Sequence, residues 1–318
     1  MSAENQSVPG SGETAQPTAW TGYLHLLVVY LVWGSTYLAI RVAVREGSGF
    51  PPFTVGASRA ILGAIALLIW AGVSRDRLKL TRRETFVLAV SGLLLWTGGN
   101  GLVVWAEQRI HSAYAALLVS TTPIWAALVE SLIDRRVPSV LLILALLLGF
   151  CGAGLLAAPI MLQGVAADSW SVVGLVLASL SWSCGSIFQN RHPVKLGART
   201  SAAYQQLFGS IGFLLLAVVA REPWPHPTPD AWWAWGYLVV FGSILAFTSF
   251  VQALRLLPTG IVFTYAYVNP LIAVILGWLV LSEPITWWTL AGTALILAGV
   301  AGVFRDRVWR ARNAKDPD

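Results

Sequence analysis

The chain has 318 residues, of which 56% are hydrophobic and only 11% are charged, and its mean hydropathy is +0.68. A soluble globule of this length needs more polar surface than this composition supplies, so the sequence predicts an integral membrane protein. The formal net charge of +6 does not indicate a nucleic-acid partner, because the basic residues lie in short loops between apolar runs. The predicted environment and partner is the lipid bilayer.

Residues 1–20 are polar and rich in Ser, Gly and Pro, without the basic start of a signal peptide, so we predict a disordered cytoplasmic tail. Ten apolar runs follow, each near the roughly 20 residues needed to cross a bilayer. Five lie in a first unit, 21–158, at about 22–42, 52–73, 84–106, 111–133 and 138–158. Five lie in a second unit, 159–304, at about 171–190, 199–220, 231–254, 258–281 and 286–304. Residues 305–318 are predicted to form a basic cytoplasmic tail.

The two units look like copies of one design. When the first unit is aligned with the second, Pro123 in the fourth run aligns with Pro270 in the ninth, and Gly152 aligns with Gly299. Because five crossings is an odd number, the second unit must cross the membrane in the opposite sense to the first. The predicted fold is therefore an all-α integral membrane protein with ten transmembrane helices, arranged as two inverted five-helix repeats.

The distribution of Lys and Arg predicts the orientation. Most of the 21 basic residues fall in the loops after the second, fourth, sixth, eighth and tenth runs, which share one predicted face. Basic loops remain on the cytoplasmic side of a membrane. We therefore predict that both termini are cytoplasmic.

Pro123 and Pro270 are the predicted helix breaks. Each proline removes the backbone hydrogen bond to the carbonyl four residues earlier, at Val119 and Ala266, and in hydrocarbon that carbonyl needs another partner. Interrupted helices at matching positions of two repeats indicate the substrate site of a transporter. The leading hypothesis is therefore solute transport through a cavity near the middle of the membrane.

Several motifs occur in order along the chain, and they are Trp33-Gly-Ser-Thr-Tyr-Leu-Ala-Ile-Arg41, Gly99-Asn-Gly-Leu-Val-Val-Trp-Ala-Glu107, Ser179-Leu-Ser-Trp-Ser-Cys-Gly-Ser186, and Tyr265-Ala-Tyr-Val-Asn-Pro270 with Glu283-Pro284. Together with Pro123 and the inverted repeat, this set resembles the drug/metabolite transporter superfamily, specifically its ten-helix EamA-type exporters. The resemblance implies a bacterial inner-membrane carrier that exports amino acids or related small metabolites, and sometimes drugs, from a cavity between the two halves.

Arg59 lies inside the second apolar run. A charge at this depth costs a few kcal/mol in lipid, so the side chain must face protein or water. Its guanidinium can hold a substrate carboxylate through two parallel hydrogen bonds. The alternative is a structural role, as partner of a freed backbone carbonyl or of an acid on a neighbouring helix.

Aromatic and polar residues of five other runs complete the predicted substrate site. Rings give broad contact to apolar or aromatic substrates, and polar groups orient the polar ends. The alternative is helix packing, in which small hydroxyl residues are common. The predicted substrate-binding residues are Trp33, Thr36, Tyr37, Arg59, Trp96, Asn100, Trp182, Tyr204, Gln206, Tyr265 and Asn269. Trp96 to Gly101 is also predicted to be a flexible, polar break in the third run.

Glu107, Arg109 and His111 are predicted to lie in an outer loop, which is either a gate or an ordinary hydrated loop. Single histidines without ligand spacing, and two cysteines inside apolar runs, give no support for an enzyme, a metal site or a cofactor. A multidrug exporter or a channel-like facilitator of the same fold stays open as an alternative. The expected partner is a small-molecule substrate, and the expected state is a monomer or weak homodimer.

Overall fold

The computed structural model describes residues 19–110, 112–162, 168–281 and 285–313, and all regular secondary structure in these segments is helical. The first repeat contains α1 (Ala19–Val44), α2 (Pro52–Val73), α3 (Arg82–Gly92), η1 (Leu93–Asn100), α4 (Gly101–Ala106), α5 (Ser112–Val119), α6 (Thr122–Asp134) and α7 (Val140–Leu162). The second contains α8 (Ser169–Arg191), α9 (Ala198–Val219), α10 (Pro229–Tyr237), η2 (Leu238–Ala246), α11 (Phe247–Leu256), α12 (Thr259–Val262), α13 (Tyr265–Leu281) and α14 (Trp287–Asn313).

The ten predicted crossings are confirmed. Within the described segments, nine helical stretches are long and apolar enough to cross a membrane. The tenth crossing, α12 with α13, is interrupted between the two helices, and its longer part, α13, has 17 residues. Residues 1–18 and 282–284 lie outside the described residues, and so does the Glu283-Pro284 motif.

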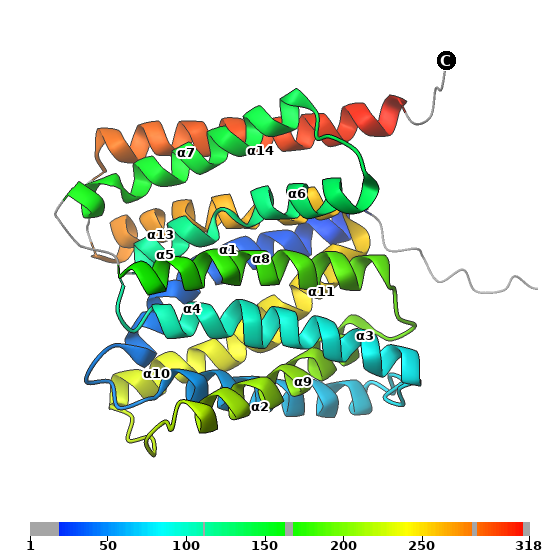
Figure 1. Ribbon diagram of the computed structural model, residues 1–318, viewed down its shortest axis with the longest axis vertical. Helices are drawn as coiled ribbons and strands as arrows, with labels where there is room; N and C mark the ends of the chain where they lie inside the picture. The colour runs from blue at the N-terminus through cyan, green and yellow to red at the C-terminus, as the bar shows by residue number, and fades with distance from the viewer. Residues whose placement is uncertain (1–18, 111, 163–167, 282–284, 314–318) are drawn as a thin grey trace, which may run out of the picture.

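Equivalent helices of the two repeats run in opposite directions. In Figure 1, α1 begins at the right side of the view, whereas its counterpart α8 begins at the left side. The same reversal holds for α7 and α14. The packing follows the same symmetry, because α1 contacts η2, α11 and α13 while α8 contacts η1, α4 and α6. The inverted repeat therefore places the middle of α1 and of α8 near the centre of the molecule.

Two helix pairs complete the molecule away from this centre. Helix α2 packs along α9, and α7 packs along α14 at the opposite edge (Figure 1). Glycines bring α7 and α14 into backbone contact, since a Cβ atom on Gly152 would lie 2.7 Å from the main-chain oxygen of Gly292. Small residues allow this close approach between helices in lipid.

The helix breaks lie near the two prolines but not at them. In the first repeat the break comes at Ser120 and Thr121, so that Pro123 stands in the first turn of α6, where a proline is tolerated. In the second repeat the break separates α12 from α13, and Pro270 lies inside α13. The prediction that the prolines themselves mark the breaks is therefore corrected.

Hydroxyl groups satisfy the carbonyls at the first break. The Oγ atom of Ser120 donates to Leu117 O at 2.5 Å, and Thr121 Oγ1 donates to Leu118 O at 2.6 Å. The carbonyl of Val119, which Pro123 leaves without its backbone donor, accepts from Thr122 Oγ1 at 2.6 Å. Leu117 O and Leu118 O also accept backbone N–H groups at 3.1 Å, so the hydroxyl of Thr122 is the one that replaces a missing backbone donor, as the hydrocarbon environment requires.

The predicted break at Trp96 to Gly101 is instead a continuous helix with widened, π-type turns in η1. A second π-helix, η2, occupies the equivalent crossing of the other repeat. Such turns are rare and concentrate at functional sites. Glycine lets α8 pack closely here, since a Cβ on Gly99 would lie 2.7 Å from Trp182 Cε3.

At one end of the molecule, the loop after α1 pairs with the loop after α9. His226 N donates to Gly49 O at 2.8 Å, and Thr228 N donates to Ser48 O at 2.9 Å. Gly49 has a φ of +72°, and a Cβ there would lie 2.1 Å from His226 O, so only glycine fits. The carboxylate of Glu222 also accepts from Phe53 N at 2.7 Å and from Thr54 N at 2.8 Å, which caps α2.

Candidate functional site

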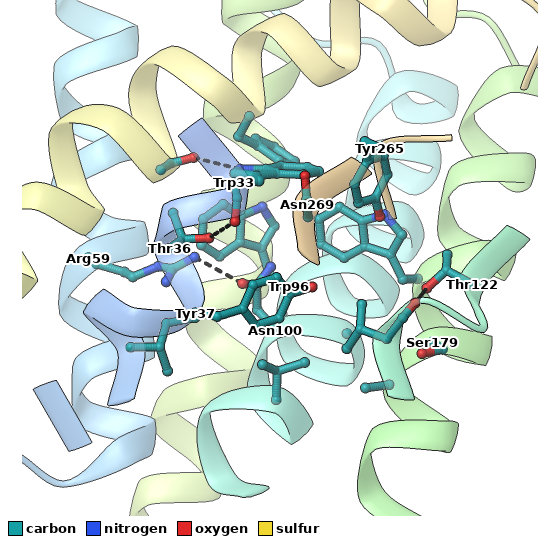
Figure 2. A pocket seen from close by; sticks show the side chains of 18 residues that line it. Trp33, Thr36, Tyr37, Arg59, Trp96, Asn100, Thr122, Ser179, Tyr265 and Asn269 are labelled. Carbon is teal, nitrogen blue, oxygen red and sulfur yellow. Dashed lines mark hydrogen bonds between the residues drawn. The ribbon is translucent and has the colours of Figure 1, made fainter. Parts of the chain in front are cut away.

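A cavity lies between the two repeats and is lined by helices of both. Water-sized spheres can occupy about 70 Å³ of it. Its lining consists of Trp33, Thr36, Tyr37, Ile40, Arg59, Trp96, Gly99, Asn100, Val103, Val119, Thr122, Ala178, Ser179, Trp182, Gly242, Phe247, Tyr265 and Asn269. In Figure 2, the labelled side chains of this lining come from α1, α2, η1, α6, α8 and α13.

Arg59 supplies the positive charge of the cavity, and no other charged side chain is among its described lining residues. The side chain is 5% exposed. Its Nη2 atom donates to Asn100 Oδ1 at 2.9 Å, and its Cζ atom lies 5.0 Å from the centre of the Trp96 ring (Figure 2). The Nε and Nη1 atoms have no hydrogen-bond partner within the described segments. Because a guanidinium carries five N–H groups, most of the donor capacity of Arg59 is unused in this structure.

Aromatic rings form the opposite part of the cavity. Trp33 meets Trp182 edge-on at 5.3 Å and Tyr265 edge-on at 5.0 Å, measured between ring centroids. Phe250, behind them, lies 5.1 Å from Trp33 and 5.3 Å from Trp182. The edge-to-face geometry is the favourable one for such rings, so the wall is fixed before any ligand binds.

Trp33 is also held by a main-chain contact. Its Nε1 atom points at Gly242 O in η2, at 3.4 Å (Figure 2). Thr36, one turn further along α1, directs its hydroxyl to Trp33 O at 2.8 Å. The π-helix of the second repeat therefore helps to position a ring that the first repeat supplies.

The broken fourth crossing reaches the cavity through Thr122. Its hydroxyl is bound to Val119 O, and its own carbonyl accepts from Ser183 Oγ at 3.1 Å. Ser179 Oγ donates to Leu175 O at 3.0 Å and lies 3.4 Å from Leu118 O. The serines of α8 thus hold the interrupted helix in place, which agrees with a packing role for these hydroxyls.

Other polar atoms in the cavity lack partners. Besides the two Arg59 nitrogens, Trp96 Nε1, Trp182 Nε1 and Asn269 Oδ1 are buried without a hydrogen bond. A buried polar atom without a partner costs free energy, and a bound ligand can recover that cost. The cavity therefore offers several donors and one amide acceptor to a polar ligand.

Nine of the eleven predicted substrate-binding residues line this cavity, and Tyr204 and Gln206 do not. The hydroxyl of Tyr204 donates to Leu78 O at 2.9 Å in the loop before α3. The amide of Gln206 donates to Ser243 O at 3.1 Å and thereby joins α9 to η2. Both side chains find main-chain partners outside the cavity.

The sequence interpretation missed several lining residues. Ile40, Val103 and Ala178 are apolar residues within apolar runs, so nothing in the sequence separates them from lipid-facing or core positions. Phe247 packs edge-on against Trp96 at 5.0 Å and gave no signal for the same reason. Thr122 precedes a proline that the sequence interpretation had singled out, and it could have been found from that position.

Glu107 does not lie in a hydrated loop, as one interpretation of the sequence had it. The residue follows α4 directly and is fully buried, and in the described part of the chain neither carboxylate oxygen has a hydrogen-bond partner. Arg109, close by, instead stacks over Trp105 at 5.0 Å, and His111 lies outside the described residues.

The described part of the chain brings together no group of three or more His, Cys, Asp or Glu side chains that could hold a metal ion. The cavity itself combines one fixed cation, aromatic rings and unpaired donors. This arrangement suits recognition of a small organic molecule.

Comparison with known proteins agrees with the fold. The model of the EamA-like transporter family matches residues 20–158 and 169–305. The chain belongs to the EamA-like transporter family. It is therefore a multi-pass membrane transporter.

Curated relatives of this family member carry transporter names. The uncharacterized inner membrane transporter YedA of Escherichia coli strain K12 is 30% identical over 254 residues, which cover 79% of this chain and 80% of YedA. The uncharacterized transporter YoaV of Bacillus subtilis strain 168 is 22% identical over 278 residues, covering 87% of this chain and 94% of YoaV. A solved crystal structure superimposes with a TM-score of 0.72 at 18% identity, covering 94% of this chain and all of that one, and supports the fold.

Proposed function

We propose that this transporter exports amino acids, aromatic and other neutral ones, or closely related small metabolites, through the central cavity by alternating access. The observation that carries this proposal is the buried guanidinium of Arg59, which keeps unpaired N–H groups beside a wall of aromatic rings. A substrate carboxylate accepts from Arg59, and an aromatic or aliphatic side chain packs against Trp33 and Trp182.

The ammonium group of such a substrate has neutral partners in this site. No acidic side chain is among the described lining residues, but Asn269 Oδ1 is an unpaired acceptor. The faces of Trp and Tyr rings attract cations as well. The site thus selects for one carboxylate and one bulky apolar part, and its described lining holds no second cation for a dicarboxylic side chain.

A panel screen in liposomes tests the proposal. Purified protein is reconstituted, and the flux of radiolabelled aromatic, aliphatic, acidic and basic amino acids is measured, with competition between substrates. We expect saturable flux of the neutral ones. Flux that does not saturate would identify a channel-like facilitator, and no flux of any amino acid would reject the substrate class.

Arg59→Ala sharpens the test. Removing one partner of a buried charged hydrogen bond costs about 2 to 5 kcal/mol, which corresponds to a loss of affinity of at least about 30-fold. Arg109→Ala is the matched control, because Arg109 also stacks on a tryptophan at 5.0 Å but lies outside the cavity. Equal carboxylate transport by wild type and Arg59→Ala would reject the role of Arg59.

A multidrug exporter is the second candidate, because aromatic rings make up much of the cavity wall. Flat lipophilic compounds without a carboxylate would pack against these rings and would form no hydrogen bond with Arg59. Export of such compounds that is equally fast in wild type and Arg59→Ala would favour this class over amino acids.

A further inference from the structure

Glu107 lies one helical turn beyond the cavity. Asn100 and Val103 line the cavity, and Glu107 follows them at three- to four-residue spacing on the same helix face. Its carboxyl group is fully buried, and neither oxygen has a hydrogen-bond partner among the residues that the structure describes. A carboxylate without donors in such a place is costly in its ionised form, so a nearby positive charge or a bound proton must stabilise it.

Two guanidinium groups act on this carboxyl from two other helices. Arg41 of α1 donates through Nη1 to the main-chain oxygens of Glu107 at 2.6 Å and of Gln108 at 2.8 Å, and therefore does not hydrogen-bond the carboxylate. Arg59 of α2 is bound to Asn100 and influences Glu107 through its charge. Tyr37 of α1 is a further titratable group, among the residues that the structure describes, that interacts electrostatically with Glu107.

Burial and the neighbouring positive charges act on the pKa of Glu107 in opposite directions. Burial raises the pKa of Glu107 well above its ordinary value, whereas the positive charges of Arg41 and Arg59 lower it. Whatever neutralises one of these guanidinium groups removes part of the support for the ionised form. Arg59 is the guanidinium that lines the cavity. The binding of an anion to Arg59 and the protonation of Glu107 therefore depend on each other.

We propose that Glu107 is a proton-binding site of the transporter, which takes up one proton from water when a carboxylate binds Arg59. The proton converts the carboxylate to a neutral carboxyl group, and no other bond changes. The link to substrate rests on the proposed function of Arg59, but the buried proton site itself does not. By thermodynamic reciprocity, protonation of Glu107 strengthens carboxylate binding by the same factor by which the carboxylate strengthens proton binding.

The pH dependence has a definite sign. Where Glu107 is ionised before binding and protonated after it, affinity for a carboxylate substrate falls by about tenfold for each unit of rising pH. At lower pH, where Glu107 already holds its proton, affinity is constant and highest. The transporter then binds substrate most tightly when the solution that reaches the cavity is acidic.

Infrared difference spectroscopy tests the proton site without a substrate. We expect the purified wild type to lose a protonated-carboxyl band as the pH is raised, and Glu107→Gln to lack this band. Glu46→Gln, which removes an exposed acid in the loop after α1, is the matched control and should keep it. A band that is the same in wild type and Glu107→Gln would overturn the proposal.

Phenylalanine then tests the linkage, in choline-based buffers so that sodium plays no part. We expect phenylalanine to raise the pH at which the wild type loses the protonated-carboxyl band. We also expect its binding to cause uptake of one proton, which a pH-sensitive dye detects in weak buffer. Phenethylamine, which lacks the carboxylate, should do neither. Glu107→Gln should bind phenylalanine with an affinity independent of pH and without proton uptake.

The two proposals fail in different ways. Phenylalanine binding to wild type with no proton uptake and no band shift would overturn the linkage and leave the proposed substrate class intact. A titrating Glu107 band in a protein that binds no amino acid would support the proton site and reject the substrate class. In Arg59→Ala, the band should remain in the substrate-free protein and become insensitive to phenylalanine.

Discussion

The Nη2 atom of Arg59 donates a 2.9 Å hydrogen bond to Oδ1 of Asn100, so the cation of the cavity is held by a neutral amide on the third crossing. A neutral partner orients the guanidinium without cancelling its charge. Under the proposed function, the N–H groups that remain unpaired are the ones that a substrate carboxylate would use.

We predict that Asn100→Ala lowers the affinity for carboxylate substrates about tenfold, because a hydrogen bond to a charged group contributes roughly 1.5 kcal/mol. Asn100→Asp should lower it further, since an aspartate pairs with Arg59 and competes with the substrate. Isothermal calorimetry with phenylalanine measures both. Unchanged affinity in Asn100→Asp would contradict this account of the pair.

We predict that Trp33→Ala weakens the binding of aromatic substrates more than that of alanine. Trp33 contacts three other rings, and ring pairs of this kind contribute about 0.5 to 1.5 kcal/mol each. Trp33→Phe should retain most of the affinity. Trp287→Phe, at an 83% exposed tryptophan, is the control and should have no effect. An equal loss for phenylalanine and alanine would indicate a packing role only.

A pair of glycines on α7 gives a prediction for stability. A Cβ on Gly152 would lie 2.7 Å from both Gly292 O and Ile296 N, and neither backbone atom can move aside easily. Gly152→Ala should lower the free energy of unfolding by about 1 to 3 kcal/mol, as overpacking does. Gly154→Ala should cost nothing, because no atom lies within 4 Å of the added methyl group. Thermal unfolding in detergent compares the two, and equal melting temperatures would contradict the close contact of α7 with α14.

The hydroxyl of Thr122 gives a prediction for the broken crossing. Thr122→Val keeps the shape and leaves Val119 O without its donor, which costs about 1 to 3 kcal/mol for a buried carbonyl. Thr122→Ser keeps the hydroxyl and should be close to wild type. Thermal unfolding again provides the measurement. Equal destabilisation by both substitutions would show that the methyl group, and not the hydroxyl, is what matters.

Much of the fold follows from the sequence because hydrocarbon imposes simple rules. A crossing needs a fixed length of apolar residues, and a charge such as Arg59 must turn inward. Because polar groups also avoid lipid, the sequence predicts that Trp33, Asn100 and Asn269 face inward, and these residues do line the cavity. Their part in substrate binding stays a prediction until it is measured.

Other positions depend on contacts that the sequence does not display. The sequence alone predicts Gln206 in the cavity, but its partner is a main-chain carbonyl of η2. The sequence also predicts Glu107 in an outer loop, whereas the packing of neighbouring helices buries it. The break before α13 comes ahead of Pro270 rather than at it, since neighbouring side chains decide where a helix in lipid can open.

The two main-chain bonds between Ser48 and Gly49 on one side and His226 and Thr228 on the other join a loop of the first repeat to a loop of the second. Side chains play no part in these bonds, so they persist through most single substitutions, with Gly49 as the exception. We expect any movement of one half against the other to be smallest at this end, where these bonds join the loops, and largest at the opposite end, where the loops before α3 and before α9 lie.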